Sequence, residues 1–409
     1  MSYLRKAYRW SPKNIGLLAS PAFVFLLIMN KSEWKIRFLD WGFGLLVAAL
    51  MVLFFILRGR IHKKELAVFI LPLLWVFYAF IMTPFAFDVN HHLKELLKVA
   101  VLILLSSFLI VALFSREKLA SKTIILTSAL WVLINSALLL FWYFGILEYE
   151  KADFSGLFQN RNEFAVQTVI LMAMCLFFVK GHSFVKAFFV ILSFLLVAST
   201  LSMKGFVLFF FVVFFPILLR SRLRKKVFYA SLFALLFACS YLAMPNIQDR
   251  MSRFSTALTN PDELRQNESA FLRVWLTVEG SKLVVQNPIT GVGVHNARFF
   301  LIPPLAQERG DEVGVYSHNN YVEMALNAGV LGLLLFYLPL VCIYFKVNVN
   351  HPHWLAIKTF SVLYLLAGIA MVQYNNFISI FLYSLIFFMY FYYEEKASFD
   401  QDSLHCQYA

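Results

Sequence analysis

The segment from Ser317 to Glu323 holds the side chains of this sequence that are best suited to acid–base chemistry. It reads Ser317-His318-Asn319-Asn320-Tyr321-Val322-Glu323, and an apolar run from Met324 to Tyr337 follows at once. An unperturbed imidazole has a pKa near neutrality, so His318 could take a proton from a hydroxyl group at physiological pH, although a lone histidine often serves only as a hydrogen-bonding residue. A polar cluster at the edge of an apolar run indicates chemistry at a membrane face.

Three cations outside the basic inner segments are further candidates for chemistry. Arg273 carries a planar guanidinium that matches phosphate oxygens. Lys204 occupies the short turn Ser202-Met203-Lys204-Gly205, and Arg161 lies in a polar cluster at 156–165. Each also has an ordinary interpretation, namely a lipid headgroup contact for Arg273, a snorkelling side chain for Lys204 and neutralisation of Arg161 by Glu163.

The composition places these residues in a membrane protein. Hydrophobic residues make up 61% of the chain, and the mean hydropathy is +0.72. Apolar runs of about twenty residues recur along the sequence, each long enough to cross a hydrocarbon core of roughly 30 Å as a helix. Runs such as 206–219 are apolar on every side, unlike the alternating strands of a membrane β-barrel. The expected fold class is therefore all-α and polytopic.

Apolar runs bounded by charge predict about twelve transmembrane helices, with a large loop between helices 9 and 10. The expected spans are 14–30, 39–57, 66–86, 97–115, 123–144, 164–179, 187–201, 206–219, 227–244, 324–345, 357–373 and 377–393. The corresponding domains are helices 1–9 (1–244), a helical cap loop (245–323), helices 10–12 (324–396) and a tail (397–409). The expected cap contains a helix over Ser269–Gln286, with Phe271, Trp275 and Val278 on one face.

Basic residues set the expected orientation. Lys and Arg concentrate in segments such as 58–64 and 220–226, and the positive-inside rule then puts both termini in the cytoplasm and the cap loop outside. The net charge of +13 is mostly this topogenic signal, so no nucleic-acid partner is expected. No metal site is expected either, because the adjacent pair His91 and His92 is a poor one and the four cysteines show no paired spacing.

The order of the motifs resembles a known family. Arg273 is followed by Asn287-Pro288-Ile289-Thr290-Gly291-Val292-Gly293, then by His318-Asn319-Asn320-Tyr321-Val322-Glu323 and by Asn327-Ala328-Gly329-Val330-Leu331-Gly332. This order resembles the O-antigen ligase and polymerase family of bacterial envelope glycosyltransferases. The cluster from Gly156 to Ala165 resembles the Asn-x-Asn-Glu segment of the same family.

The resemblance implies transfer of a saccharide from an undecaprenyl-diphosphate-linked glycan donor to a hydroxyl acceptor, without a metal or other cofactor, at the periplasmic face of the bacterial inner membrane. Carried over by position, His318 is expected to be the general base. Arg273, Lys204 and Arg161 are expected to bind the diphosphate, although the family cation at the position of Lys204 is usually arginine, and lysine loses the bidentate fork. Asn319, Asn320 and Glu323 are expected to support His318.

Several functions stay open at this stage. Ligation of O-polysaccharide onto lipid A-core is favoured, because related ligases rely on a loop histidine, whereas polymerisation of lipid-linked repeat units uses the same donor with a glycan acceptor. An oligosaccharyltransferase that modifies protein belongs to the same superfamily. A membrane transporter is the alternative from another class, but the sequence shows neither two related halves nor clearly interrupted helices near the bilayer midplane.

Overall fold

The computed structural model describes residues 63–114, 117–146, 154–156, 160–179, 183–243, 269–308, 310, 314–369 and 371–407, with single positions between 248 and 259. Within these ranges every regular element is a helix, which confirms the all-α fold class. The first two predicted spans, 14–30 and 39–57, lie outside the described residues.

Each later predicted span overlaps a helix. In chain order these helices are α4 (Lys63–Ile81), α5 (Val89–Phe114), α6 (Glu117–Tyr143), α7 (Arg161–Phe178), α8 (Ser183–Ser199), α9 (Met203–Arg220), α10 (Leu223–Ala243), α14 (Asn320–Lys346), α15 (Trp354–Gly368) and α16 (Phe377–Gln407). In the described part of the chain, 5 helices are long and apolar enough to cross a membrane, namely α5, most of α6, α7, α9 and α14. The helix α16 continues into the range predicted as a tail.

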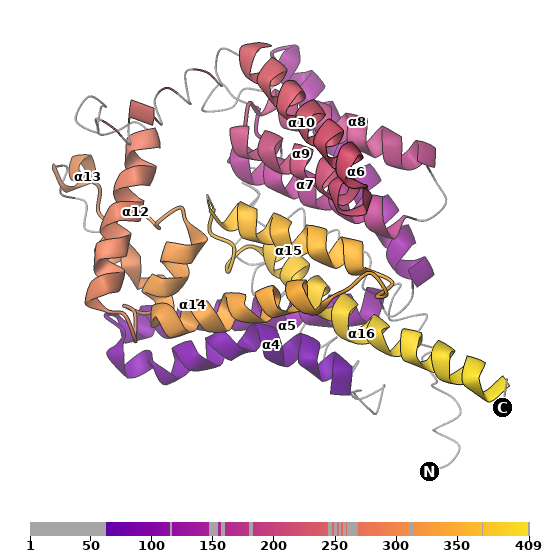
Figure 1. Ribbon diagram of the computed structural model, residues 1–409. Coiled ribbons are helices and arrows are strands. Elements are labelled where there is room, and N and C mark those ends of the chain that lie inside the picture. The colour runs from indigo at the N-terminus through magenta and orange to yellow at the C-terminus, as the bar shows by residue number, and fades with distance from the viewer. Residues whose placement is uncertain are drawn as a thin grey trace, which may run out of the picture.

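The helices pack in two groups (Figure 1). One group contains α4, α5, α14 and α16, and the other contains the helices from α6 to α10. The helix α15 joins them, because it packs against α9 on one side and against α14 and α16 on the other. A single apolar core runs through both groups and includes large buried side chains such as Trp75, Phe164 and Phe360.

The described part of the predicted cap packs on α14. It comprises α12 (Ser269–Gln286), which has the predicted bounds, the short helix η3 (Asn296–Phe299) and α13 (Pro304–Glu308). Leu276 and Leu283 of α12 are buried in a second, smaller core. Two residues of the helix face that was predicted to be apolar differ in burial. Trp275 packs against this core, whereas Val278 is 47% exposed.

The N-terminal ends of α7 and α9 are fixed side by side. Asn160 caps α7 by accepting a hydrogen bond from the backbone N–H of Asn162, and Ser202 caps α9 by accepting one from Gly205. The Ser202 hydroxyl also donates to Oδ1 of Asn162 at 2.7 Å. A Cβ on Gly205 would lie only 2.5 Å from Cβ of Ala165, so this glycine permits the close approach of the two helices.

The helix α14 is interrupted at Ala328 and Gly329, where the backbone dihedral angles are not helical. The segment 288–292 fills the break: the N–H of Val330 donates to the carbonyl of Pro288, and the N–H of Val292 donates to the carbonyl of Leu326, both at 2.7 Å. Broken helices inside a membrane protein are tolerated where other backbone groups satisfy the freed ones. The sequence does not clearly show this interruption, and the predicted span 324–345 is broken in the structure.

Candidate active site

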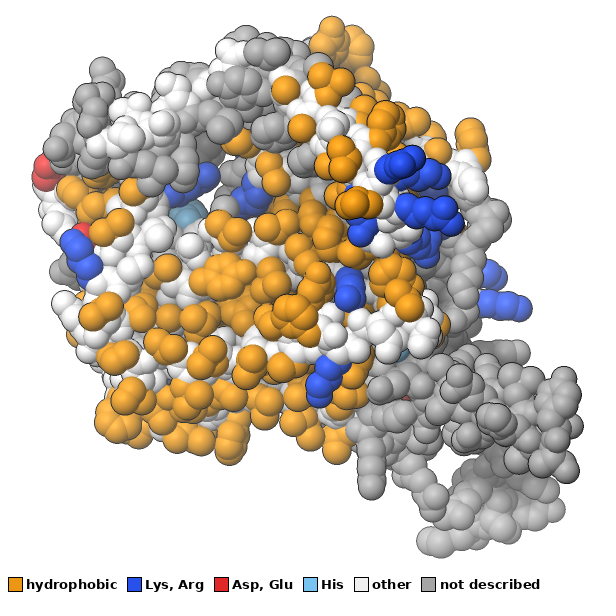
Figure 2. Space-filling model, in the orientation of Figure 1, with side chains coloured by type: hydrophobic (Ala, Val, Ile, Leu, Met, Phe, Trp, Pro, Cys, Tyr) orange, Lys and Arg blue, Asp and Glu red, His pale blue; other side chains and the backbone are white. Residues whose placement is uncertain are grey.

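Side chains from five separate segments line one pocket, which we call the polar pocket. The lining residues are Asn160, Asn162, Glu163, Lys204, Arg273, Tyr316, His318, Met371, Val372 and Asn375. The pocket encloses about 460 Å³ of space not filled by protein atoms, part of it open to solvent. Figure 2 shows a hollow beside α12 where Lys or Arg side chains and a His side chain gather.

The structure brings together three of the residues predicted from the sequence. Lys204 comes from the first turn of α9, Arg273 from α12, and His318 from the loop that precedes α14, and all three line the polar pocket. Arg161 is the first residue of α7 but is not among the lining residues. Its sequence neighbours Asn160 and Asn162 do line the pocket, so Arg161 lies next to it.

His318 is held in an unusual backbone conformation by hydrogen bonds on both sides. Its φ is +57°, in the left-handed region, which is energetically unfavourable for residues other than glycine unless the surroundings impose it. On one side the N–H of Ser317 donates to Oε2 of Glu323 at 2.9 Å. On the other side the Asn319 side chain caps α14 by accepting from the N–H groups of Tyr321 and Val322. The histidine is therefore positioned before any substrate binds.

The other residues predicted to support His318 are buried and hydrogen-bonded. Nδ2 of Asn320 donates to the hydroxyl of Tyr337 at 2.6 Å, and Oδ1 of Asn320 accepts from the N–H of Gln373 at 2.8 Å. Asn320 thus ties the start of α14 to the segment that contributes Met371, Val372 and Asn375 to the pocket. Glu323 is 1% exposed and anchors Ser317, as described above.

Positively charged and negatively charged side chains both line the polar pocket. Lys204 lies within electrostatic range of Arg273 and of Glu163. The first turns of α7 and α9 also line the pocket, and the N-terminus of a helix carries roughly half a positive charge. Two basic side chains and two helix N-termini are groups of the kind that bind anions, and the Glu163 carboxylate lies among them.

Five polar lining residues had not been assigned a role from the sequence, namely Asn160, Asn162, Glu163, Tyr316 and Asn375. Glu163 had been considered only as a partner for Arg161. Burial raises the pKa of Tyr316 to about 12, with a further increase from Glu163 and Glu323 and a decrease from Arg273, so the Tyr316 hydroxyl keeps its proton. The Tyr316 ring lies 4.3 Å from the His318 ring, centroid to centroid.

Asn375, another unassigned residue, lies between two helices. Its Oδ1 is buried and has no hydrogen-bond partner among the described residues. The polar stretch 374–376 between two predicted spans could have drawn attention to it.

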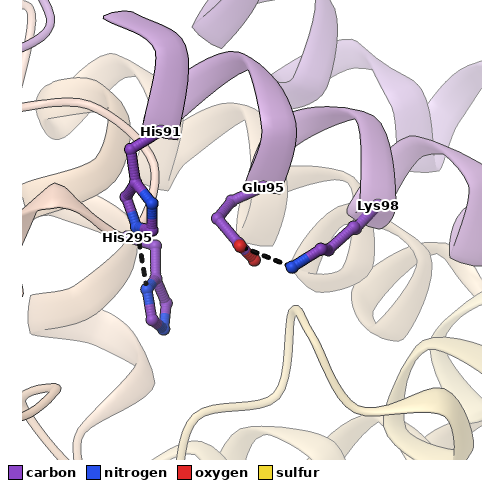
Figure 3. A network of polar contacts seen from close by, with 4 residues as sticks. All are labelled: His91, Glu95, Lys98 and His295. Atoms are coloured by element: carbon purple, nitrogen blue, oxygen red, sulfur yellow. Dashed lines mark hydrogen bonds and ion pairs between the residues drawn. The ribbon is translucent and has the colours of Figure 1, made fainter. Parts of the chain in front are cut away.

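A second polar cluster lies at the start of α5 (Figure 3). His91 does not form a site with His92; its Nε2 lies 3.4 Å from Nδ1 of His295, and Glu95 pairs with Lys98 on the same face of the helix. His92 is buried and accepts a hydrogen bond from the N–H of Val294. Among the described residues, no group of three or more His, Cys, Asp or Glu side chains is arranged to hold a metal.

A known protein family matches the part of the chain that contains several residues of the polar pocket. Residues 187–337 match the family model described as O-antigen ligase. This segment is similar to the O-antigen ligase family. This match confirms the resemblance drawn from the motifs, and it indicates a membrane glycosyltransferase-like enzyme of the O-antigen ligase or polymerase type.

The matched O-antigen ligase segment contains Lys204, Arg273, His318 and the interruption of α14. Two walls of the polar pocket, which carry Glu163 and Asn375, lie outside the matched residues. No curated protein matches the chain.

Proposed function

We propose that this protein transfers a saccharide from an undecaprenyl-diphosphate-linked donor to a hydroxyl group of lipid A-core, at the periplasmic face of the inner membrane. The observation that carries this proposal is the convergence of Lys204, Arg273 and His318 on one pocket. The family match supports a lipid-linked glycan and an acceptor as the substrates.

Lys204 and Arg273 are proposed to bind the diphosphate. Negative charge accumulates on the leaving diphosphate as the glycosidic bond breaks, and fixed positive groups lower the energy of that transition state. The N-termini of α7 and α9 add to the same field. Because these groups supply the positive charge, we propose that the reaction needs no metal. Arg161, beside the pocket, is proposed as an outer contact for the donor.

His318 is proposed to remove the proton from the acceptor hydroxyl. The hydroxyl oxygen then attacks the anomeric carbon from the face opposite the diphosphate, and the proton stays on the imidazole until it is released to solvent. General bases of this kind typically contribute between about 10² and 10⁴ in rate. Direct displacement predicts inversion at the anomeric carbon, and product with retained configuration would exclude it.

The choice of lipid A-core as acceptor rests on His318, as does the preference for ligation over polymerisation of repeat units. The test is a lipopolysaccharide gel together with an assay of undecaprenyl-linked glycan, in a host that lacks this gene and is complemented with the wild type or with His318→Ala. A ligase predicts that the variant leaves lipid A-core without O-chains while long polymer accumulates on undecaprenyl diphosphate. Core that carries a single repeat unit would instead identify a polymerase. Profiles that are the same in the host without the gene and in the host complemented with the wild type would exclude both activities.

A further inference from the structure

The polar pocket contains a carboxylate that the proposed transfer does not use. Glu163, in the first turn of α7, is 8% exposed and lines the pocket with Lys204 and Arg273. It lies within electrostatic range of Lys204 and of Tyr316, whose ring contacts His318. A carboxylate at this position opposes the binding of a diphosphate, so its presence in an anion-binding pocket needs an explanation.

The two diphosphate species that occupy the pocket in turn differ in charge. In the donor, the terminal phosphate is esterified to the sugar. When the bond from the anomeric carbon to the phosphate oxygen breaks, that oxygen keeps the electron pair, and the released undecaprenyl diphosphate has a free terminal phosphate. This group gains roughly one further negative charge at neutral pH, because its second pKa is near 6. A pocket that contained only the two cations would therefore hold the product more tightly than the donor, and product release often limits turnover.

We propose that Glu163 is a charge-balancing residue that weakens the hold of the polar pocket on the diphosphate product and so speeds its release. The repulsion grows with the charge of the ligand, so it acts more strongly on the product than on the donor. This inference rests on the proposed function, since it takes the diphosphate to be bound by Lys204 and Arg273. It assigns Glu163 a role in release, while the chemical step stays with His318.

An ordinary structural role makes the opposite prediction. An acidic residue in the first turn of a helix stabilises the helix terminus, as Glu163 does for α7, so its loss would loosen the pocket and weaken ligand binding. A charge-balancing role predicts tighter binding of an anion when the carboxylate is removed. Gain of affinity is a result that structural damage does not produce.

The experiment measures the binding of inorganic pyrophosphate by titration calorimetry to the full-length protein in lipid nanodiscs. Glu163→Gln is expected to lower the Kd for pyrophosphate roughly tenfold relative to the wild type. This is the order of magnitude expected when one negative charge is removed from the immediate surroundings of a bound anion. The matched control is Glu279→Gln on α12, which removes an equal charge from a side chain paired with Lys282 outside the pocket, and it should leave the Kd unchanged. In transfer assays Glu163→Gln should turn over more slowly and be inhibited by less undecaprenyl diphosphate.

Further variants separate this inference from the proposed function. Arg273→Gln and Lys204→Gln are expected to weaken pyrophosphate binding, and the double variant Lys204→Gln/Glu163→Gln is expected to bind more tightly than Lys204→Gln alone. If the two cation variants weaken binding while neither variant that lacks Glu163 strengthens it, charge balancing is overturned and the anion site stands. If the cation variants have no effect, the diphosphate site itself is wrong.

Discussion

At the scale of single residues, the two cations in the polar pocket differ in what they offer a diphosphate. Lysine presents a point charge on a flexible stem, whereas arginine presents a planar fork that binds two phosphate oxygens at once. Lys204 extends from the first turn of a helix whose N-terminus already favours anions. Arg273 lies beyond the first turn of α12, so it depends on its own side chain for directional contacts with an anion.

This difference predicts unequal effects of exchanging the two residue types. Lys204→Arg is expected to keep kcat/KM for the donor within about threefold of the wild type, because it keeps the charge and gains a fork. Arg273→Lys is expected to lower kcat/KM about tenfold, because it keeps the charge and loses the bidentate contact. Lys282→Arg, outside the pocket on the same helix as Arg273, is the control. Equal effects of the two pocket exchanges would contradict the proposed division of roles.

The sequence predicted those pocket residues that stand out at the edge of an apolar run. Lys204 and His318 are such residues, and Arg273 was found within the amphipathic helix predicted for the cap. Glu163 was missed as a pocket residue because its neighbour Arg161 offered a local partner for its charge. Asn375 was missed although it stands in a polar stretch between two predicted spans, because only the folded chain brings that connection to the pocket.

At the scale of elements, the interruption of α14 is the feature that the helical pattern could not reveal. The run 324–345 is apolar apart from Asn327 and reads as one span. The break depends on Gly329, whose φ is +68°, and on a backbone segment that lies far away in the sequence. Hydropathy predicts that a helix exists, but it does not predict which backbone groups approach it from outside.

Gly329 is therefore expected to tolerate no side chain. A Cβ at this position would lie 2.0 Å from the carbonyl oxygen of Ile289, so Gly329→Ala combines a backbone conformation that is unfavourable for alanine with a clash against the backbone. Gly145→Ala is the matched control, because Gly145 has a φ of +70° and nothing within 4 Å of the added carbon. We expect Gly145→Ala to lower the free energy of unfolding by about 1 kcal/mol. Gly329→Ala is expected to lower the melting temperature by clearly more than Gly145→Ala does. Equal melting temperatures would show that the break does not depend on this close approach.

The contact between α5 and the segment before η3 is expected to respond to pH. Burial lowers the pKa of His295 below its ordinary value of 6.5, and Arg298, His91 and Lys98 lower it further against the opposing effect of Glu95. The unfolded chain then binds a proton at His295 more readily than the folded chain does. The stability that neutral His295 provides is therefore present above pH 6.5 and lost as the pH falls through the folded-state pKa.

Thermal melting of the purified protein tests this expectation. The melting temperature of the wild type should fall as the pH is lowered from about 7 to about 5.5, and that of His295→Gln should fall less, because glutamine does not titrate. Identical pH profiles of the two proteins would show that His295 makes no contribution.

At the scale of the whole molecule, the two helix groups and the described part of the cap enclose a pocket that no single element could form. Helices α7 and α9 belong to one group, and α12 belongs to the cap. The segment 371–375 lies between α15 and α16, and α16 belongs to the other group. The proposed reaction further requires this pocket to face the periplasm. Orientation is a property that the basic residues predict and that the packing of the helices does not fix.

Cysteine labelling tests the orientation. In a protein without its native cysteines, Glu308→Cys on α13 should react in intact cells with a maleimide that crosses the outer membrane but not the inner one. Arg222→Cys, between α9 and α10, should react only after the inner membrane is permeabilised. Both side chains are exposed, so burial does not limit either reaction. The reverse pattern would place the polar pocket on the cytoplasmic side and contradict the proposed function.

The most direct test of the polar pocket as the site of glycosyl transfer is a transfer assay with purified protein in proteoliposomes, given an undecaprenyl-diphosphate-linked glycan and lipid A-core. His318→Ala is expected to lower the transfer rate by at least about 10²-fold, while its pyrophosphate Kd and melting temperature stay close to those of the wild type. Transfer by His318→Ala at a rate near that of the wild type would contradict the assignment of His318 as the base, and with it the polar pocket as the site of transfer.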